Sequence, residues 1–180
     1  RLGAHAQVGT AKDGELKKVA SLLEEIGATS RNLIDAMNDI VWSVDPKNDS
    51  FDVLLLRMKT HAARVLDAKG INYEIDIPPA LAGERLPLEF RRRFFLIFKE
   101  AINNIVRHAR ATKVTLKIRR EKKALVMTIA DNGSGFDPAI AHQGNGLLNM
   151  KERAASINGD LSIATAKGSG TTITLRAAIP

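Results

Sequence analysis

The stretch FKEAINNIVRHAR, residues 98–110, decides the fold because it combines two kinds of residue at helical spacing. Two adjacent asparagines interrupt a run that otherwise suits burial, although asparagine is a poor helix former. Apolar residues recur every three or four positions and should face a core: Phe98, Ala101, Ile102, Ile105, Val106 and Ala109. At about 100° per residue, four polar residues gather on the other side: Glu100, Asn104, Arg107 and His108. The stretch therefore predicts a helix with a core side and a polar side.

Length and composition are those of an ordinary folded protein. The 180 residues suffice for one medium domain, or for a smaller domain with an appended helical element. Apolar residues make up 44% and charged residues 26%, which excludes a disordered or fibrous chain. The sequence has no cysteine, so disulfides and thiolate metal sites are excluded. No apolar run approaches the roughly 20 residues of a membrane span and no signal peptide opens the chain, so we expect this piece to be soluble.

The formal net charge of +7 favours an anionic partner, such as nucleic acid, a membrane surface or a nucleotide phosphate. Basic residues are densest in two runs, residues 91–93 and 119–123. Neither run contains an aromatic residue that could stack on bases. We therefore predict that both runs are solvated faces and that the chain has no nucleic-acid partner.

The N-terminal part carries a narrow apolar stripe. Its positions step alternately by three and four residues for about four heptads, with one serine in the series: Leu16, Val19, Leu23, Ile26, Ser30, Leu33, Met37, Ile40 and Val44. Such a seam predicts a long helix that packs on a partner helix; the alternative is an ordinary amphipathic helix packed on its own domain. Asp45-Pro46 should end the helix, because proline disfavours helical geometry in the residue before it.

The remaining chain mixes helical and strand patterns. Asp49 or Ser50 can cap a helix that ends at Gly70, and the helix of the opening stretch extends from about Leu88 to Ala109. Alternating strands are expected at residues 71–77, 113–120, 124–131, 160–166 and 171–179, with a further helix at about 147–157. The second and third strands should form a hairpin. Because strands and helices do not alternate one for one, the pattern predicts an α+β layer rather than a doubly wound sheet.

Two glycine clusters bracket a short segment of this second part. In DNGSGFD, residues 131–137, Asp131 ends a strand, and Gly133 and Gly135 let the backbone approach a ligand or take positive φ. In GNGLLNM, residues 144–150, Gly144 and Gly146 leave unpaired amides at a helix start, which suit a phosphate. Neither cluster matches the dinucleotide fingerprint, and the chain has no Walker loop. Each cluster alone is often a plain loop, but the pair together predicts a ligand site.

The polar side of the helix carries groups that can hold a metal. The amide oxygen of Asn104 is a ligand for a hard cation such as Mg²⁺, which keeps phosphate partners beside it. Glu100, one turn earlier, can position or deprotonate an attacking group. The alternative is a solvated helix face. Asn103 lies at the margin of the projection, so we expect Asn104 alone to be the metal ligand.

The order of four motifs carries a family resemblance. E-x-x-x-N-x-x-x-H on a helix is followed by D-x-G-x-G-F, then G-x-G-L, then G-T before the last strand. This series closely resembles the ATP-binding domain shared by gyrase, mismatch-repair ATPases and sensor histidine kinases. KEAINNIVRHARAT, DNGSGFD, GNGLLNMKERAASINGDL and GTTITLRAAIP look like the histidine-kinase branch of the nitrate-sensor and lipid-sensor type. The resemblance covers about residues 70–180 and implies a Bergerat-type two-layer sandwich, in which helices back a mixed sheet.

The resemblance implies a role for each motif residue. Asp131 would accept the adenine amino group, Gly133 and Gly135 would let the base lie close, and Phe136 belongs to the same nucleotide-binding loop. Asn104 would hold Mg²⁺, Glu100 would be the catalytic base or orient water, and Arg107 or His108 would face phosphate. The lid's hinge and phosphate contacts would come from Gly144, Gly146 and Leu147. The adenine side would be closed by Gly170 and Thr171. Residues 136–143 are short for a lid.

In these kinases a helical hairpin dimerises as a four-helix bundle, and its first helix carries the histidine that receives phosphate. MNDIVWSVDPKNDS, residues 37–50, resembles the end of the second helix and the connector. The resemblance therefore implies a flexible tail at residues 1–14, the second bundle helix with its connector at 15–46, and the ATP-binding catalytic domain at 47–180. The first bundle helix is missing. We expect His5, which is followed by Ala6, to be a tail residue rather than the acceptor.

These features predict the ATP-binding catalytic region of a two-component sensor histidine kinase. It would transfer the γ-phosphoryl group of Mg-ATP to a histidine that this chain lacks, for relay to a response-regulator receiver domain, and would not autophosphorylate alone. The parent would be a homodimer through its helical bundle, with this region as the cytoplasmic part of a membrane-bound sensor. Two alternatives stay open: an anti-sigma-type serine kinase, which would not need the heptad helix, and a non-catalytic nucleotide-sensing dimerisation module.

Overall fold

The computed structural model describes residues 18–23, 25–27, 29–30, 33–34, 37, 50–78, 85–137 and 145–179. The chain divides into two compact units, residues 1–42 and residues 43–180. The tail predicted at residues 1–14, with His5, lies outside the described residues, as do Leu16, Ile40 and Val44 of the heptad seam. The two boundaries predicted from the family resemblance therefore remain predictions.

The first unit is helical wherever it is described. The described apolar residues of the heptad seam are 53% to 64% exposed: Val19, Leu23, Ile26, Leu33 and Met37. Burying such side chains is favourable by about 25 cal/mol for each Å² of apolar surface. The packing of this seam on a partner helix stays a prediction.

A mixed sheet organises the second unit. Its strands lie in the order β1-β2-β3-β5-β4, in which β1 pairs parallel to β2 and the other neighbours pair antiparallel. The prediction of an α+β sheet is confirmed, and each predicted strand end lies within one residue of the observed end. The strands are β1 (Asn72–Asp76), β2 (Lys113–Glu121), β3 (Ala124–Asp131), β4 (Gly159–Thr165) and β5 (Thr171–Ala178).

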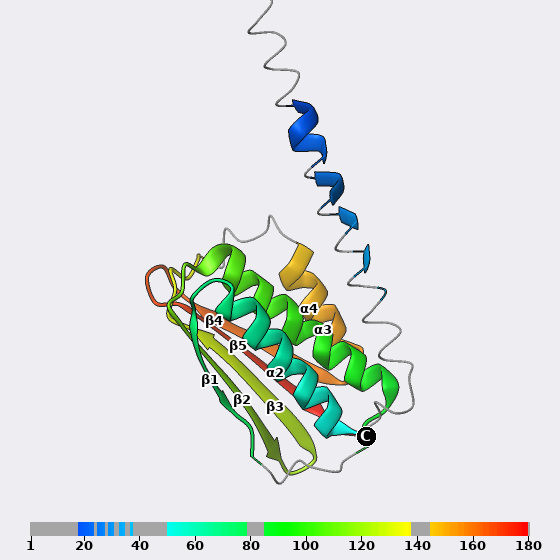
Figure 1. The fold of residues 1–180 in the computed structure, drawn as a ribbon. Helices are drawn as coiled ribbons and strands as arrows, with labels where there is room; N and C mark the ends of the chain where they lie inside the picture. The colour runs from blue at the N-terminus through cyan, green and yellow to red at the C-terminus, as the bar shows by residue number, and fades with distance from the viewer. Residues whose placement is uncertain are drawn as a thin grey trace, which may run out of the picture. The chain divides into compact units, whose positions relative to one another are not determined.

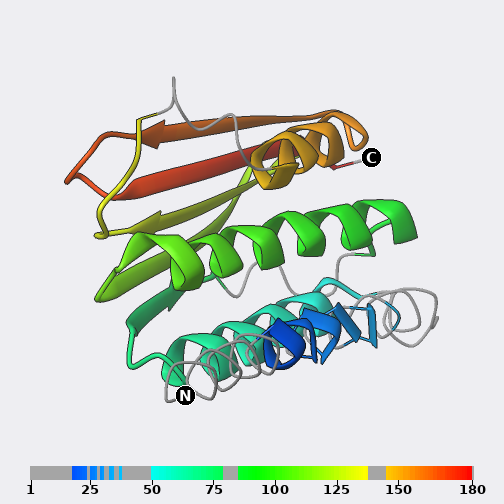
Figure 2. The same ribbon diagram turned by 90° about the horizontal axis from the view of Figure 1, so that it is seen from above.

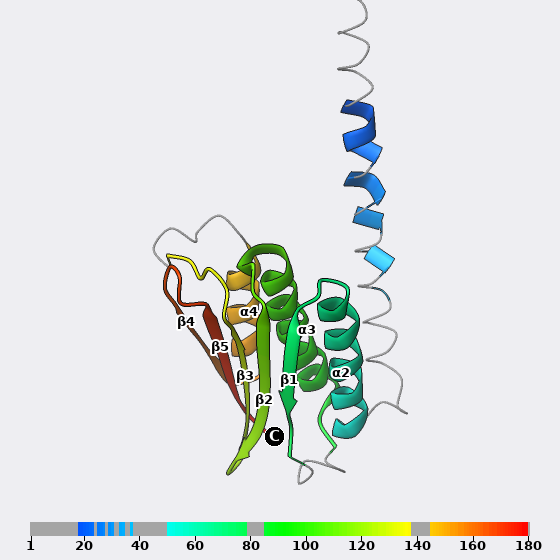
Figure 3. The same cartoon turned by 60° about the vertical axis from the view of Figure 1, so that its left-hand side comes forward.

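Three helices cover one face of this sheet (Figures 1 and 3). They are α2 (Phe51–Asp67), α3 (Leu88–Asn104) and α4 (Asn145–Ala155). Viewed from above, α3 lies between α2 and α4, and it packs on both (Figure 2). No described helix lies on the opposite face of the sheet, and none is long and apolar enough to cross a membrane.

Of the two residues predicted to cap α2, Ser50 is the N-cap. Its hydroxyl oxygen accepts a hydrogen bond from the amide of Val53 at 3.4 Å, which satisfies one of the donors left open at a helix start. Gly70 follows the helix with φ of +64°, a conformation that glycine adopts at little cost. This cap sets the start of α2.

The central helix α3 contributes several of the largest core side chains. Phe94, Ile97, Phe98 and Ile102 are completely buried, and the Phe90 and Phe94 rings stack with centroids 5.8 Å apart. α2 adds His61, whose ring meets Phe98 edge-on at 5.9 Å. Full burial of one such aromatic side chain contributes on the order of 1.5–3 kcal/mol, so this helix anchors the sandwich.

The prediction that residues 91–93 form a solvated face is wrong for Arg91. This side chain is only 4% exposed, and its Nε donates a hydrogen bond to the carbonyl oxygen of Leu86 at 3.0 Å. Arg91 lies three residues before Phe94 and seven before Phe98, so it shares the apolar stripe of α3. Arg92 and Arg93 are partly exposed.

The predicted helix continues past Asn104 as a π-helical turn, η3 (Ile105–Ala109), rather than as α-helix. Arg110 then ends it in the left-handed region with φ of 52°. A π turn bonds residue i to residue i+5, so the residues within it rotate away from the α-helical projection. This accounts for Val106, which the periodicity places toward the core but which is only half-buried.

Candidate functional site

One cavity of about 400 Å³ opens between α3, the ends of β3 and β5, and the start of α4. Its volume lies in the range of small-molecule sites, about 300–1,000 Å³. The structure brings ten of the residues predicted from sequence around it: Glu100, Asn104, Arg107, His108, Asp131, Gly135, Phe136, Gly146, Leu147 and Thr171. Gly133 and Gly170 do not line the cavity, and Gly144 lies outside the described residues.

The polar side of the helix faces this cavity. Glu100 and Asn104, one turn apart on α3, are half-buried in the cavity wall, whereas Arg107 and His108 on η3 are exposed at its edge. Asn103 does not line the cavity. The helix thus presents carboxylate and amide oxygens inside the cavity and places Arg107's positive charge nearer solvent, an order that suits a polyanionic ligand with a bound cation.

Asp131 ends β3 with its carboxylate in the cavity wall. Its Oδ1 accepts a hydrogen bond from the amide of Gly133 at 2.8 Å. Desolvation by burial raises the pKa of this carboxyl above its ordinary value, although hydrogen bonds from the Gly133 and Thr171 backbones oppose the rise. A carboxylate held in a partly apolar wall is a directional acceptor for a ligand N–H group.

The glycine loop after Asp131 is packed backbone against backbone. A Cβ atom at Gly133 would overlap the carbonyl oxygen of Ala109, and one at Gly135 would overlap the carbonyl oxygen of Ala166. Gly135 also has φ of +56°. The sequence predicted close approach to a ligand or positive φ at these glycines; the close approach that the structure shows is to the protein's own backbone, on both sides of the loop.

Ser134 joins the two sides of the loop. Its amide donates to the carbonyl oxygen of Ala109 at 2.7 Å, and its carbonyl oxygen accepts from the amide of Gly168 at 2.6 Å. The loop is therefore fixed between the end of η3 and the β4–β5 turn. This places Asp131 and Phe136 at set positions relative to both walls.

Asn132 ties the same loop to the start of β2. Its Oδ1 accepts from the amides of Thr112 and Lys113 at 2.9 and 2.8 Å, and its Nδ2 donates to the Thr112 hydroxyl at 2.9 Å. The Asn132 side chain is exposed and lies outside the cavity wall. It holds the chain that leaves η3 beside the loop that carries Asp131, and the sequence analysis did not single it out.

The start of α4 forms the remaining wall. Gly146 and Leu147 line the cavity, and a Cβ atom at Gly146 would overlap Oε1 of Glu100. The first amides of a helix lack partners within the helix and attract anions. The missing side chain at Gly146 therefore leaves room for the Glu100 carboxylate beside this helix start.

Sequence reasoning missed the apolar part of the wall, which consists of Ala101, Ile105, Ala109, Ile129 and Ile173. The signal for two of them was available. Ile129 and Ile173 lie two residues from Asp131 and Thr171 on their strands, and residues i and i+2 of a strand point to the same face. These apolar side chains give the cavity flat surfaces beside the carboxylate.

The oxygen atoms of Asn104 and Glu100 in the cavity wall fit one Mg²⁺ ion that is also coordinated by a phosphate group. Asn104 and Glu100 offer oxygen atoms from consecutive turns of α3, and Mg²⁺ usually takes one or two protein ligands beside phosphates and waters. Within the described parts of the chain, no group of three or more acidic or histidine side chains is arranged to hold a metal.

A family model described as histidine kinase-, DNA gyrase B- and HSP90-like ATPase matches residues 90–180. The match covers just over half of the chain and includes every motif residue named above. The chain belongs to this ATPase family. The predicted family membership is thereby confirmed, and ATP is the nucleotide implied for the cavity of this family member.

Relatives of this ATPase domain carry names of sensor kinases. The signal transduction histidine-protein kinase/phosphatase UhpB of Salmonella typhimurium is 28% identical over 170 residues, which cover 92% of this chain and 32% of UhpB. The histidine-protein kinase/phosphatase DegS of Brevibacillus brevis is 40% identical over 92 residues, covering 51% of this chain and 24% of DegS. The sensor protein VraS of Staphylococcus aureus is 37% identical over 94 residues, covering 52% and 27%. The chain thus spans about a third or less of each relative.

Solved structures share the fold of this ATPase domain. The histidine kinase AdeS of Acinetobacter baumannii superposes with a TM-score of 0.65 at 16% identity, covering 94% of each chain. The histidine kinase domain of the Erythrobacter litoralis blue-light activated kinase EL346 gives a TM-score of 0.61 at 18% identity, covering 70% of this chain and 61% of the other. The predicted sandwich of a mixed sheet backed by helices is confirmed.

Proposed function

We propose that this chain is the ATP-binding catalytic region of a sensor histidine kinase, which transfers the γ-phosphoryl group of Mg-ATP to a histidine supplied by another part of the parent protein. The observation that carries the proposal is the convergence of Asp131, Asn104 and Glu100 on one cavity from β3 and α3. The names of the relatives support the choice of histidine as acceptor.

The adenine end of the ligand is assigned to the inner part of the cavity. Asp131 accepts the adenine amino hydrogen, while Ile129 and Ile173 on neighbouring strands contact the flat face of the ring. Thr171 and Phe136 close the same side. A carboxylate acceptor discriminates adenine from a base that presents a carbonyl oxygen at that position, because two acceptors would face each other.

The phosphate end is assigned to the mouth of the cavity. Asn104 holds Mg²⁺, which when bound would neutralise phosphate charge as it develops. Arg107 and His108 lie at the exposed edge of the cavity, and the first amides of α4 add partial positive charge from the other side. These groups hold the triphosphate so that its γ-phosphorus faces an incoming imidazole.

The transfer is then a displacement at phosphorus. The P–O bond to ADP breaks as a P–N bond to the acceptor imidazole forms, and the imidazole proton is released. Glu100 lies beside Asn104 in the wall, where it can orient the imidazole or take that proton. Most of the rate enhancement comes from positioning and charge stabilisation rather than from covalent chemistry by this domain.

The N-terminal helix is assigned to a dimeric bundle. Its described apolar seam residues are more than half exposed, including Leu23 and Met37, which suits packing against helices of a second copy. The acceptor histidine would lie in the parent, which we place at a membrane with this region on the cytoplasmic side. A response-regulator receiver domain would take the phosphoryl group from that histidine.

A transfer assay tests the proposal. The chain is mixed with radiolabelled ATP, Mg²⁺ and a helical bundle that supplies an acceptor histidine, and acid-labile, alkali-stable phosphate on the bundle is measured. We expect labelling by the wild-type chain, at least a hundredfold less by Asn104→Asp, and wild-type labelling by Asn103→Asp, because Asn103 does not line the cavity. Asn103→Asp is a matched control because it changes the neighbouring residue in the same way.

The other outcomes identify the rivals. ATP binding without transfer would favour the nucleotide-sensing dimerisation module. Acid-stable phosphate on serine would favour the serine kinase. Equal loss of labelling in both asparagine variants would contradict the assignment of Asn104 as the metal ligand.

A further inference from the structure

Thr165, the last residue of β4, carries a hydroxyl that joins two segments of the cavity wall. The Thr165 Oγ1 accepts a hydrogen bond from the amide of Phe136 at 3.1 Å and donates to the carbonyl oxygen of Gly170 at 3.0 Å. It also lies 3.2 Å from Oγ1 of Thr171. A hydroxyl has one hydrogen, so with the Thr165 hydrogen directed at Gly170 the Thr171 hydroxyl is the donor in that third contact.

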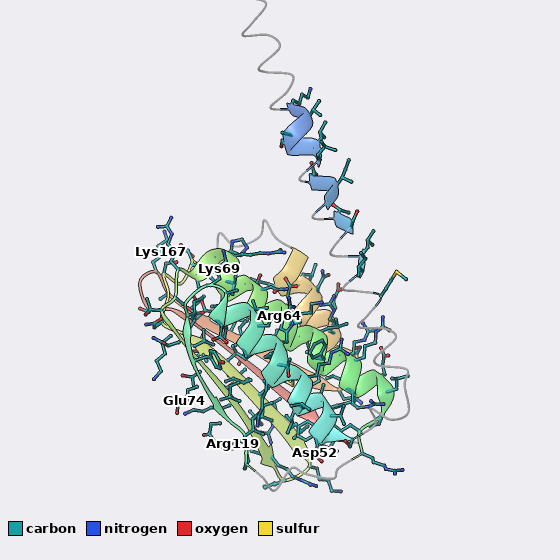
Figure 4. All side chains as sticks on the ribbon, viewed as in Figure 1. Asp52, Arg64, Lys69, Glu74, Arg119 and Lys167 are labelled. Carbon is teal, nitrogen blue, oxygen red and sulfur yellow. The ribbon has the colours of Figure 1, made fainter. Side chains whose placement is uncertain are left out.

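The two segments joined by Thr165 lie far apart in the chain. Phe136 belongs to the loop after β3, whereas Gly170 and Thr171 follow the β4–β5 turn, whose tip is marked by Lys167 in Figure 4. Phe136 and Thr171 both line the cavity, but Thr165 does not. Its effect on a ligand therefore has to act through these two neighbours.

The glycines around Thr165 add to the constraint. Gly170 has φ of +71°, and a Cβ atom there would overlap the carbonyl oxygen of Asp131. The Thr165 hydroxyl thus fixes the carbonyl group of Gly170, and Gly170 packs directly against the backbone of Asp131. Without a side-chain acceptor, the amide of Phe136 would lose its partner in a part-buried position, which is costly.

We propose that Thr165 is a positioning residue of the nucleotide site, whose hydroxyl sets the spacing between Phe136 and Thr171 across the adenine end of the cavity. This proposal rests on the proposed function, because it takes the inner cavity as the adenine site. Its chemistry is specific: an oxygen that accepts one hydrogen bond and donates another is required, and the threonine methyl group is not.

The test compares four variants by calorimetric titration with ATP, ADP and inorganic tripolyphosphate. Thr165→Val keeps the shape and removes the hydroxyl, and Thr165→Ala removes it with less volume, in case valine prevents folding. Thr165→Ser restores the hydroxyl. Thr174→Val is the matched control, because Thr174 is a half-buried threonine on β5 with no side-chain hydrogen bond among the described residues.

We expect Thr165→Val or Thr165→Ala to lower the affinity for ATP and ADP about tenfold, equivalent to about 1.4 kcal/mol of binding free energy. Tripolyphosphate should bind these variants as it binds the wild type, since it lacks the base. Thr165→Ser and Thr174→Val should bind nucleotide within about twofold of the wild type, a difference of about 0.4 kcal/mol. Wild-type nucleotide affinity in the hydroxyl-free variants would overturn the proposal, as would equal weakening of tripolyphosphate or failure of serine to restore binding.

Hydrogen exchange of the Phe136 amide separates this proposal from the proposed function. In the nucleotide-free protein, the amide should exchange at least tenfold faster in Thr165→Val than in the wild type, with no change in Thr165→Ser. If wild-type chain binds no ATP, the proposed function fails whatever the exchange shows, and the positioning role fails with it. If it binds ATP and the exchange rates are equal, only the role of Thr165 is overturned.

Discussion

The two ends of the helix–sheet sandwich are built from the same elements, α3, β3 and β5, but are filled by opposite kinds of side chain. At the far end, Phe94, Leu125 and Leu175 are completely buried. At the cavity end, Asn104, Asp131 and Thr171 continue the same elements and are only half-buried. The difference shows that each element contributes buried packing over one part of its length and lines the cavity over the other.

The cavity end also carries features that lower stability. Asp131 is held where burial raises the pKa of its carboxyl, and Gly135 takes a left-handed conformation against a neighbouring carbonyl group. Such features persist when a ligand site needs them and the rest of the fold compensates. The far end supplies that compensation through aromatic and aliphatic packing.

The largest effect is expected from breaking the far end. Phe94→Ala should lower the free energy of unfolding by about 3–5 kcal/mol, because it removes a fully buried ring and leaves a cavity. The measurement is urea denaturation. Leu56→Ala on α2 is the control: Leu56 is 64% exposed, and its loss should change stability by no more than about 0.5 kcal/mol. Similar losses in both variants would show that the far end is not the stabilising part.

The next effect separates two glycines with positive φ. Gly135→Ala and Gly168→Ala should each lower the free energy of unfolding by about 1–2 kcal/mol, because alanine is strained in the left-handed conformation. Gly135→Ala should lower the free energy of unfolding by about 1–3 kcal/mol more, because its Cβ would overlap the carbonyl oxygen of Ala166. The space at Gly168 is open. Denaturation curves with ATP titrations check this, and only Gly135→Ala should weaken nucleotide binding. Equal losses would mean that the loop after β3 is not closely packed against the Ala166 carbonyl oxygen.

A smaller effect with a defined pH dependence is expected at Asp131. Because its pKa is raised in the folded state, the stability from this carboxyl is present below its unfolded pKa and is lost as pH rises through the folded value. Asp131→Asn should therefore be more stable than the wild type at about pH 7 and equal to it at about pH 3. Denaturation across this range measures the difference. A variant less stable than the wild type at neutral pH would reverse the assigned sign.

The smallest effect is expected on the uncovered face of the sheet. Asp76 pairs with Arg119, and the hydrogen bond from that guanidinium lowers the pKa of the Asp76 carboxyl. The sign is opposite to that at Asp131: the contribution is present above the unfolded pKa and is lost as pH falls through the folded value. Both side chains are exposed, so Asp76→Asn should leave the denaturation midpoint at neutral pH unchanged within error. A clear loss at neutral pH would show that this pair is more than a surface contact.

Much of the fold followed from sequence because it depends on local periodicity. The strand ends, the Ser50 cap and the two sides of α3 are all encoded by spacing and by residue type. The burial of Arg91 was also encoded, since it shares the stripe of Phe94, but its position in a run of three arginines concealed it. Charge density along the chain is a poorer guide than position around the helix.

The rest of the site depends on contacts between distant segments. The polar residues around the cavity were predicted from motif order, but the Thr165 and Asn132 hydrogen bonds arise from the pairing of strands and loops. The π turn at residues 105–109 has no periodic signal either, and the loop after β3 packs on its last residue, Ala109. Thr165 and Asn132 hold segments of the cavity wall in place without lining the cavity themselves.

The most direct test of the central claim is calorimetric titration of the wild-type chain and Asp131→Asn with Mg-ATP and Mg-GTP. The wild type should bind one ATP molecule, and its affinity for GTP should be at least tenfold lower. Asp131→Asn should lose at least about 1.4 kcal/mol of ATP binding free energy. A hundredfold excess of ATP over its dissociation constant should also stabilise the wild type by about 2.7 kcal/mol. Absence of saturable ATP binding, or the same ATP affinity in both proteins, would contradict the assignment of this cavity.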